Sequence, residues 1–308
     1  MSLDKTRDDF VKGKLAKPDY IEKMYCDNHA HLFDYAKYIH KTDINKIEIS
    51  SEGVVFYTKM FGIKMLCLED DFRLAPIEIL NFLKYEPDET AMMLRLMPEA
   101  ATIFDVGANA GWYSVLFAKN DSGANVYSYE PIPKTYDLLK KNVVLNSLQN
   151  IEIFNCGLSD NEGELVFYYH PEGSGNASSV NVAERSDIRT VSAAVKTLDA
   201  VRNERGLSVD FIKCDVEGAE LMVYQGGKET IANDKPIIFS EMLRKWASKF
   251  GYHPNQIIDY LSGFGYICCV VDGDRLSVFQ SMDDSTAETN FFFLHETKHK
   301  DELDKLLV

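Results

Sequence analysis

The 308-residue sequence has no run of lysine or arginine, and its formal net charge is −15. A surface that binds nucleic acid by neutralising phosphates is therefore not expected. The first residues, "MSLDKTRDDFVKGK", contain no apolar core of the kind that a signal peptide carries. No apolar run approaches the length of a membrane span. These absences favour a cytoplasmic protein with no membrane span and no nucleic-acid partner.

Cysteine is present, but no two cysteines have the C-x-x-C spacing of a metal or redox motif. Several of the six lie in apolar, strand-like runs, as buried free thiols do. Cys268 and Cys269 are adjacent, so on a strand they should face opposite sides. Neither a zinc site nor a disulfide is favoured. The composition, 45% hydrophobic and 26% charged, is that of a globular protein.

Residues 1–95 differ in pattern from the rest of the chain. Apolar residues between Ile21 and Ile39 recur at helical spacing, which predicts one or two amphipathic helices. Residues 46–70, "KIEISSEGVVFYTKMFGIKMLCLED", predict two or three short strands with turns at Ser-Glu-Gly and Phe-Gly. A further amphipathic segment, "DETAMMLRLMPE", follows. We predict an N-terminal α+β cap over residues 1–95.

Strand and helix patterns alternate through residues 96–308. The predicted strands are Thr102–Val106, Asn125–Glu130, Ile151–Cys156, Val209–Asp215, Pro236–Glu241, Tyr266–Asp272 and "NFFFLHE" near the end. The predicted helices are "WYSVLFAKN", "KTYDLLKKNVVLN", "ELMVYQGGKETIAN" and "NQIIDYLSGFG". This alternation predicts an α/β domain with a doubly wound, mostly parallel seven-stranded sheet. Ligands of such sheets lie outside the carboxyl ends of the strands, where the strand order reverses.

The stretch "ATIFDVGANAGWYSVLFAKN", residues 101–120, joins a strand to a helix through a turn with two glycines. Asp105 lies near the strand's end, and Gly107 and Gly111 bracket the turn. Glycine permits positive φ and leaves no Cβ between the backbone and a ligand. Glu130 ends the next strand, where a carboxylate can accept hydrogen bonds from both ribose hydroxyls. The pattern predicts a bound nucleoside; a turn that only packs strand against helix is the alternative.

The residues of this turn distinguish between two nucleoside cofactors. The dinucleotide fingerprint G-x-G-x-x-G places a pyrophosphate on the helix N-terminus. Here the turn reads G-x-N-x-G, with Asn109 in place of the middle glycine and Asp105 before it. An aspartate is more useful beside a cationic amino-acid group than beside phosphates. The turn therefore favours S-adenosylmethionine, and a nicotinamide-dependent oxidoreductase is the disfavoured alternative.

Five segments occur in an order typical of one family: "IFDVGANAGWYSVLFAK", "VYSYEPIPKTYDLLKKNVVLN", "CGLSDNEGELVF", "VKTLDAV" and "VDFIKCDVEGAELMVYQGGKETI". Over roughly residues 80–245 the chain resembles the FkbM family, and the Asp-Val-Gly-Ala-Asn and Asp-Val-Glu-Gly-Ala-Glu segments together make the resemblance specific. The resemblance implies a class I, Rossmann-like methyltransferase that uses S-adenosylmethionine. It also implies O-methylation of a saccharide, glycolipid or secondary metabolite.

The same resemblance assigns residues to the parts of the cofactor. It places at the methionine end Asp105, Gly107, Asn109 and Gly111. Glu130 takes the ribose. Ser159 and Asp160, just past the third strand, are placed to contact the adenine, although Asp160 also fits an ordinary turn. Tyr85 and Glu86 match a Tyr-Glu pair that such proteins often carry before the first strand, so Glu86 is expected to contact the cofactor.

Methyl transfer to oxygen is an in-line displacement, in which the protein must align the acceptor hydroxyl, take its proton and exclude water. Asp215 and Glu217 follow the fourth strand and Glu241 ends the fifth. Three carboxylates at one edge can orient a hydroxyl, raise one another's pKa or hold a divalent metal ion. Glu217 could instead cap the next helix or pair with Lys213. We expect Asp215 to face both the cofactor and the acceptor.

Residues 170–187 are rich in glycine, serine and asparagine, which predicts a lid or an acceptor-binding loop beside the site. His170 could serve as the general base because its unperturbed pKa lies near neutrality, or it could be a solvated surface residue. We expect a small-molecule or glycan acceptor. The residues identify neither the acceptor nor the oligomeric state. A non-catalytic module that binds S-adenosylmethionine is the second hypothesis.

Overall fold

Eight strands form the central sheet of the computed structural model, which describes residues 3–170, 173–181 and 188–308. The strand order across the sheet is β14-β13-β15-β12-β11-β4-β5-β6. In chain order these strands are β4 (Thr102–Val106), β5 (Asn125–Tyr129), β6 (Ile151–Phe154), β11 (Phe211–Cys214), β12 (Ile237–Glu241), β13 (Tyr266–Asp272), β14 (Arg275–Val278) and β15 (Asn290–His295). The neighbours from β12 to β6 all pair in parallel, whereas β15 and β14 run antiparallel to their neighbours.

Both faces of this sheet are buried. Ile103 and Phe211 belong to one hydrophobic cluster, and their neighbours in sequence, Phe104 and Ile212, belong to another. Successive side chains of a strand point to opposite faces, so the two clusters lie on the two sides of the sheet. The first cluster includes residues of α5 (Pro87–Leu96) and α6 (Trp112–Asn120), and the second includes residues of α8 (Leu198–Arg205), α9 (Glu220–Gln225) and α12 (Asn255–Ser262). The predicted doubly wound, mostly parallel α/β sheet is confirmed.

The sheet has one strand more than the seven predicted. The additional strand is β14, which follows β13 after the two residues Gly273 and Asp274 and pairs with it as a hairpin. Gly273 has a φ of 63°, which the tight turn requires and which glycine adopts without strain. The Gly-Asp pair between β13 and β14 is a sequence signal of a two-residue hairpin loop.

The order of the strands decides where a ligand can bind. The chain enters the sheet at β4, continues outward to β5 and β6, and then returns to the other side of β4 with β11 and β12. The strand order therefore reverses between β4 and β11. At such a point the connections leave in opposite directions and open a crevice at the carboxyl ends of the strands.

The predicted helices are present, and one of them is divided. The segment predicted as one helix, "ELMVYQGGKETIAN", forms α9 and α10 (Lys228–Asn233), separated by Gly226 and Gly227. A Cβ on Gly226 would lie 2.1 Å from the carbonyl oxygen of Ser159, so the backbone at this break packs directly on another segment. The remaining helices of the main domain are α7 (Pro133–Leu145), α11 (Arg244–Ala247), η3 (Ser248–Phe250) and α13 (Lys300–Leu306).

A second sheet, which was not predicted, lies between β6 and α8 in the chain. Its order is β7-β10-β8-β9, with bounds Gly157–Leu158, Arg189–Lys196, Gly163–His170 and Gly173–Ser178. The segment predicted as a loop, residues 170–187, therefore contains strand β9. Residues 171–172 and 182–187 of that segment lie outside the described residues.

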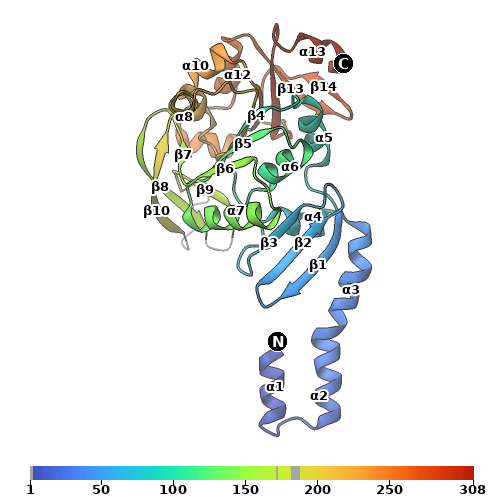
Figure 1. Cartoon of the computed structure of the whole chain (residues 1–308). Coiled ribbons are helices and arrows are strands. Elements are labelled where there is room, and N and C mark those ends of the chain that lie inside the picture. The colour runs from blue at the N-terminus through green and yellow to red at the C-terminus, as the bar shows by residue number, and fades with distance from the viewer. Residues whose placement is uncertain (1–2, 171–172, 182–187) are drawn as a thin grey trace.

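The N-terminal region consists of helices followed by a small sheet. The helical elements are α1 (Leu3–Val11), α2 (Lys17–Met24), the π-helical turn η1 (Tyr25–His29), α3 (Ala30–Tyr38) and η2 (Ile39–Lys41). Figure 1 shows α1, α2 and most of α3 extending away from the rest of the chain. The strands β1 (Ile44–Ser50), β2 (Gly53–Thr58) and β3 (Lys64–Cys67) form an antiparallel sheet, and α4 (Ala75–Phe82) follows it. The predicted helices and short strands are confirmed.

Strand β3 is attached to helix α7 through two asparagine side chains. The backbone N–H groups of Lys64 and Leu66 donate to the side-chain oxygens of Asn146 and Asn142, at 2.9 and 2.8 Å. Apolar residues of the small sheet, including Phe56 and Met65, join the hydrophobic cluster on the α6 side of the main sheet. The division at residue 95 stays a prediction, since the core is continuous across it. Among the described residues, no helix combines the length and apolar character that crossing a bilayer needs.

Candidate active site

A cavity of about 720 Å³ lies at the carboxyl ends of the parallel strands. Its lining includes most of the residues predicted from the sequence: Tyr85, Glu86, Gly107, Asn109, Glu130, Ser159, Asp215, Glu217 and Glu241. Four other predicted residues, Asp105, Gly111, Asp160 and His170, are not among the described residues that line it. Direct ligand contact is therefore supported for the first group only, and the roles of all these residues stay predictions.

The two glycines of the β4–α6 turn are required by close packing within the protein. Gly107 and Gly111 have φ values of 74° and 87°. A Cβ on Gly107 would lie 1.8 Å from the carbonyl oxygen of Asp215, and one on Gly111 would lie 2.3 Å from Cδ1 of Leu139. The turn thus lies directly against the end of β11 and against α7. This packing brings Gly107 and Asp215 to the same cavity wall.

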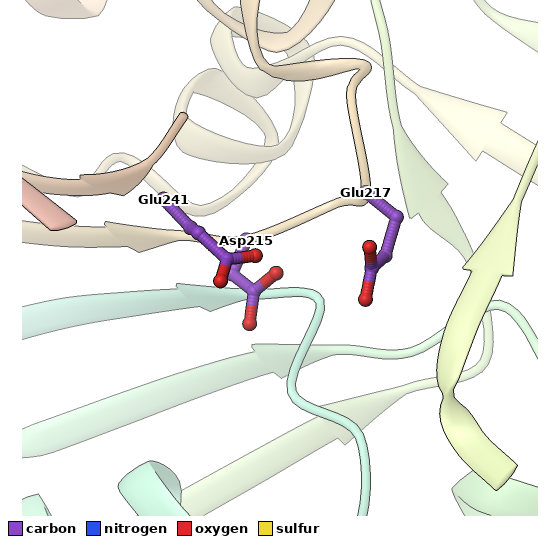
Figure 2. Close-up of side chains that lie close together, drawn as sticks. All are labelled: Asp215, Glu217 and Glu241. Atoms are coloured by element: carbon purple, nitrogen blue, oxygen red, sulfur yellow. The ribbon is translucent and has the colours of Figure 1, made fainter. Parts of the chain in front are cut away.

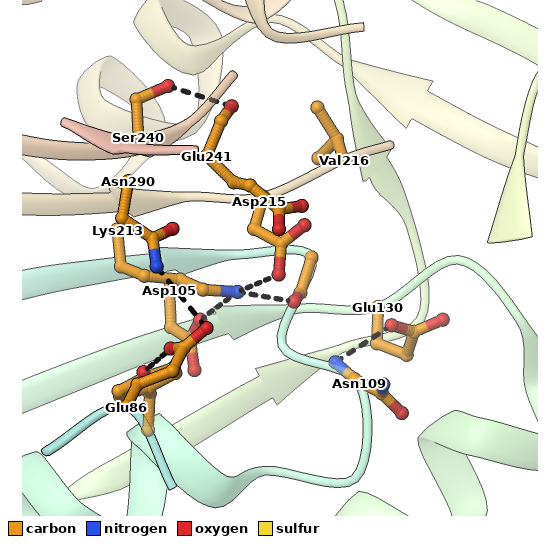
Figure 3. Close-up of polar contacts among 12 residues, drawn as sticks. Glu86, Asp105, Asn109, Glu130, Lys213, Asp215, Val216, Ser240, Glu241 and Asn290 are labelled. Carbon is orange, nitrogen blue, oxygen red and sulfur yellow. Dashed lines mark hydrogen bonds and ion pairs between the residues drawn. The ribbon is translucent and has the colours of Figure 1, made fainter. Parts of the chain in front are cut away.

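A buried lysine links the turn to the end of β11. The Lys213 side chain, 4% exposed, places Nζ 3.6 Å from Oδ1 of Asp105 and 3.4 Å from Oδ2 of Asp215. It also donates a hydrogen bond of 2.9 Å to the carbonyl oxygen of Gly107. Figure 3 shows Lys213 between the two aspartates. Burial alone would lower the pKa of Lys213, but the charges of Asp215 and Asp105 outweigh it and raise the pKa above its ordinary value.

Asp105 lies behind this lysine, out of contact with solvent. Its Oδ2 accepts a hydrogen bond from Ser114 on α6, and the Ser114 and Ser128 hydroxyls lie 2.8 Å apart. Burial raises the pKa of Asp105, while Lys213 and Ser114 offset part of that rise. Asp105 can therefore act on a ligand through Lys213 and the turn that it supports, since it does not line the cavity.

Glu130 follows β5 and is 5% exposed. Its Oε2 accepts the backbone N–H of Asn109 at 3.0 Å (Figure 3). Its Oε1 accepts the backbone N–H of Ile132 at 2.9 Å. Each carboxylate oxygen has a second lone pair that these bonds leave open. Burial raises the pKa of Glu130 to about 7, against the effect of the two backbone hydrogen bonds. The carboxylate is thus oriented in the cavity wall with acceptor capacity to spare.

Ser159 lines the cavity, whereas Asp160 does not. Ser159 is buried at the cavity wall, and its hydroxyl donates to Oδ1 of Asp160 at 3.1 Å. Asp160 is exposed. The carbonyl of Ser159 is the group that approaches Gly226, so the break between α9 and α10 positions this wall.

Three carboxylates meet at the ends of β11 and β12. Oxygen atoms of Asp215, Glu217 and Glu241 all lie within 4.8 Å of one another (Figure 2). The predicted convergence of these groups is confirmed. Burial and then the neighbouring charge of Asp215 raise the pKa values of Glu217 and Glu241 well above the ordinary range. A cluster of this kind can hold protons or accept a cation.

The loop that carries Glu217 is held by Glu220, the first residue of α9. Oε1 of Glu220 accepts the backbone N–H groups of Val216 and Gly218, at 3.1 and 3.0 Å. The hydroxyl of Tyr252 donates to the carbonyl of Gly218 at 2.8 Å. Glu217 itself has a φ of 54°, an unusual value for a side chain of this size. Glu217 does not cap helix α9, which has no side-chain cap, and its carboxylate lines the cavity.

Glu86 connects the segment before α5 to two elements of the main domain. Its carboxylate accepts a hydrogen bond from the Tyr113 hydroxyl of α6. It accepts another, of 3.3 Å, from the Asn290 amide of β15 (Figure 3). Burial raises its pKa. The Tyr85 ring contacts the Trp112 and Tyr113 rings, with centroids 5.7 and 6.2 Å apart. The Tyr-Glu pair thus forms a fixed part of the cavity wall.

His170 ends strand β8 and is 6% exposed, so it is not a solvated surface residue. The strand that follows it reaches the carboxylate cluster: Ser178 of β9 donates to the carbonyl of Glu217 at 3.0 Å, and Ser179 lines the cavity. The segment predicted to lie beside the site is therefore in contact with it, while a catalytic role for His170 stays a prediction.

Residues 105–268, just over half of the chain, match the methyltransferase FkbM domain. The match contains the glycine turn, Glu130 and all three clustered carboxylates. The chain belongs to the FkbM methyltransferase family. Two residues that position the site of this FkbM protein, Lys213 and Glu220, were not assigned such roles from the sequence. A lysine within an apolar parallel strand is a usable signal, because a buried lysine needs a charged partner.

Three relatives illustrate the similarity of this FkbM protein to known methyltransferases. Methyltransferase sdnD of Sordaria araneosa is 32% identical over 162 residues, covering 43% of this chain and 62% of that protein. 2-O-methyltransferase NoeI of Sinorhizobium fredii is 30% identical over 193 residues, covering 56% and 77%. Hexuronic acid methyltransferase AglP of Haloferax volcanii is 28% identical over 144 residues, covering 47% and 57%. The chain thus spans less than two thirds of the Sordaria and Haloferax proteins.

Proposed function

We propose that this FkbM protein is an S-adenosylmethionine-dependent O-methyltransferase that acts on a hydroxyl of a saccharide, glycolipid or secondary metabolite. One observation carries the proposal: a wall that suits a nucleoside and a cluster of carboxylates line the same cavity. The wall is formed by Gly107, Asn109 and Glu130. The cluster is formed by Asp215, Glu217 and Glu241. Relatives named for 2-O-methylation and for hexuronic acid methylation support an oxygen acceptor on a saccharide.

The residues of the cavity wall fit S-adenosylmethionine. Its ribose has two hydroxyl donors, and Glu130 has lone pairs left for them. Its amino-acid end carries an ammonium group, and Oδ1 of Asn109 is a buried acceptor without a hydrogen-bond partner among the described residues. When bound, the cofactor supplies an electrophilic methyl group on a sulfonium.

The protein's contribution to the reaction centres on Asp215. Lys213 fixes one of its oxygens, which leaves the other to accept a hydrogen bond from the acceptor hydroxyl. During methyl transfer Asp215 would take the proton that the acceptor hydroxyl loses. Glu217 and Glu241 lie beside Asp215 and would position the acceptor hydroxyl in line with the methyl group. Burial of the cluster excludes water that would compete for the methyl group.

Cofactor affinity is expected to rise with pH between about pH 5.5 and about pH 8, by at least roughly tenfold. Ribose hydroxyls donate to the ionised form of Glu130, and its pKa of about 7 leaves it protonated at the lower pH. Without cofactor, the contribution of Glu130 to folding stability should change with pH in the opposite direction. Its folded state retains a proton that the unfolded state releases, so the stability contributed falls as pH rises from about 4.5 to 7.

Titration calorimetry on Glu130→Gln checks this assignment. The variant should bind S-adenosylmethionine at least about tenfold more weakly at pH 8, because charge-assisted hydrogen bonds to ribose contribute about 1.5–3 kcal/mol each. Its affinity should also lose the pH dependence attributed to Glu130. A parent-like pH profile in Glu130→Gln would show that another group titrates.

We also propose that the carboxylate cluster works without a metal ion, because the ammonium group of Lys213 lies 3.4 Å from Asp215 and already offsets part of the cluster's negative charge. Turnover after dialysis against EDTA is expected to stay within about twofold of the untreated protein. Added Mg²⁺ or Mn²⁺ should leave it unchanged. Loss of turnover on EDTA treatment, restored by either ion, would instead identify Asp215, Glu217 and Glu241 as an essential metal site.

Two measurements test the function as a whole. Calorimetry with S-adenosylmethionine and with NAD decides the cofactor, and tight binding of NAD alone would falsify the proposal. Formation of S-adenosylhomocysteine with a pool of saccharide acceptors separates an enzyme from a non-catalytic binding module.

We propose that the protein is located in the cytoplasm, where thiols stay reduced. All six cysteines lie in the described part of the chain and are free.

A further inference from the structure

Three cationic residues are among those that line the cavity. They are Lys41, Arg73 and Lys84, and all of them come from the N-terminal region. These residues are exposed, as are the neighbouring lining residues Phe82 and Leu83. Glu130 is buried and Asp215 partly buried, so the cations occupy the outer end of the cavity and the carboxylates its inner end. We call the group Lys41, Arg73 and Lys84 the cationic mouth.

Among the described residues, neither the Lys41 nor the Lys84 ammonium group has an ion-pair or hydrogen-bond partner. Arg73 uses Nε to contact Glu78 at 3.0 Å, and its guanidinium has two further nitrogens for a ligand. Positive charge without partners is notable in a chain of net charge −15, where carboxylates are plentiful.

The backbone that presents Lys84 is fixed in an unfavourable conformation. Leu83 and Glu86 have φ values of 74° and 40°, and each such residue costs on the order of 1–3 kcal/mol. The segment is held at both ends: the carbonyl of Leu83 accepts the N–H of Asp43 at 2.8 Å, and Glu86 is bound by Tyr113 and Asn290. The Asp43 contact also brings the Lys41 segment beside Lys84. Strain of this kind concentrates at ligand sites.

Arg73 is also held by a neighbouring residue, and its charge reaches the carboxylate cluster. Its backbone N–H donates to Oδ1 of Asp71, a residue that is 4% exposed. Burial and the charges of Asp215 and Glu220 raise the pKa of Glu217, and the charge of Arg73 offsets part of this rise. Arg73 is thus close enough to act on the carboxylate cluster, and the cationic mouth adjoins the reaction site.

We propose that the methyl acceptor carries an anionic group, a carboxylate, phosphate or sulfate, which Lys41, Arg73 and Lys84 bind at the cavity mouth. This inference rests on the proposed function and adds the acceptor's charge and its orientation. The anionic group faces the mouth because the inner carboxylates repel it, and the hydroxyl to be methylated points toward Asp215. The exposed ring of Phe82, 71% accessible, lies at the same end and offers an apolar face for a sugar ring.

The test uses four sugars that differ only at C6: glucose, glucuronic acid, glucose 6-phosphate and glucose 6-sulfate. Each is titrated into the protein with S-adenosylhomocysteine present, and binding is followed by NMR or calorimetry. At least one anionic sugar should bind about tenfold more tightly than glucose, as expected for charge-assisted hydrogen bonds. Which of the three binds best identifies the anion. The preference should shrink as salt is added, because exposed charges are screened.

A matched pair of variants shows whether the cationic mouth is responsible. The triple variant Lys41→Gln, Arg73→Gln, Lys84→Gln should bind the anionic sugars and glucose equally. The control Lys37→Gln, Lys140→Gln, Lys141→Gln removes three positive charges from exposed residues outside the cavity lining and should keep the preference. Both should bind S-adenosylmethionine within about twofold of the parent.

Equal binding of all four sugars by the parent protein would overturn the inference. So would a mouth variant that loses affinity for S-adenosylmethionine while keeping its sugar preference, since the cations would then bind the cofactor's carboxylate. Failure of the proposed function would give a different result, because the parent protein would then not bind S-adenosylmethionine. The sugars can also be titrated without any cofactor, so the two outcomes are measured independently.

Discussion

Asp215→Asn is expected to lower the single-turnover rate of methyl transfer by about 10²–10⁴, the usual size of a general acid–base contribution. Asparagine keeps the size of the side chain but cannot take the hydroxyl proton. The wall that holds the nucleoside is formed by other residues, Asn109 and Glu130 among them, so cofactor affinity should stay within a few-fold. The loss should therefore appear in turnover and hardly in the dissociation constant.

Glu130→Ala provides the matched comparison for this variant. It removes a carboxylate from the same cavity, and we expect it to weaken cofactor binding by at least roughly tenfold. The two variants should thus fail in different measurements: cofactor affinity by calorimetry for Glu130→Ala, and single-turnover methyl transfer for Asp215→Asn. Loss of cofactor binding in Asp215→Asn with none in Glu130→Ala would mean that the nucleoside lies along the sheet in the reverse orientation.

Lys213→Met is expected to reduce the free energy of unfolding by about 3–5 kcal/mol, because it removes the counter-charge of a buried aspartate. The side chains of Lys213 and Asp105 are 4% and 0% exposed, so water cannot replace the lost partner. The same substitution also frees the carbonyl of Gly107 and one oxygen of Asp215. Chemical denaturation of the variant measures the loss.

Two further variants separate the charge effect from a general effect of the substitution. Lys213→Met combined with Asp105→Asn should recover much of the stability, since it removes the uncompensated charge. Lys196→Met breaks an exposed ion pair with Glu204, whose side chains are 38% and 52% exposed, and should cost less than about 1 kcal/mol. A loss of under about 1 kcal/mol in Lys213→Met would show that Asp105 is protonated in the folded protein.

The sequence by itself determined the α/β class, the glycine turn and the meeting of the three carboxylates. Apolar runs alternating with helical periodicity leave few arrangements other than a sheet covered on both faces. Parallel strands end at one edge, so Asp215 and Glu241, at the ends of adjacent strands, had to lie close together. Local patterns were sufficient here because strand direction alone brings these residues together.

Other features depend on contacts between segments that are distant in the chain, and only the tertiary structure decided them. Gly107 is explained by the carbonyl of Asp215, and the helix break at Gly226 by that of Ser159. A glycine in a sequence does not reveal which backbone approaches it. The second sheet was missed for a similar reason, since its strands β7 and β10 pair across an intervening hairpin.

The charged groups that complete the site also depend on contacts between segments that are distant in the chain. Lys213 links Asp105 of β4 to Asp215 after β11. Glu220, the first residue of α9, holds the loop that precedes this helix. The cationic mouth brings Lys41, Arg73 and Lys84 to the cavity of the carboxylate cluster, whose three residues lie more than a hundred residues further along the chain. A charge in a sequence has no assigned partner, because electrostatic pairing depends on distance and burial. Both are set only when the chain has folded.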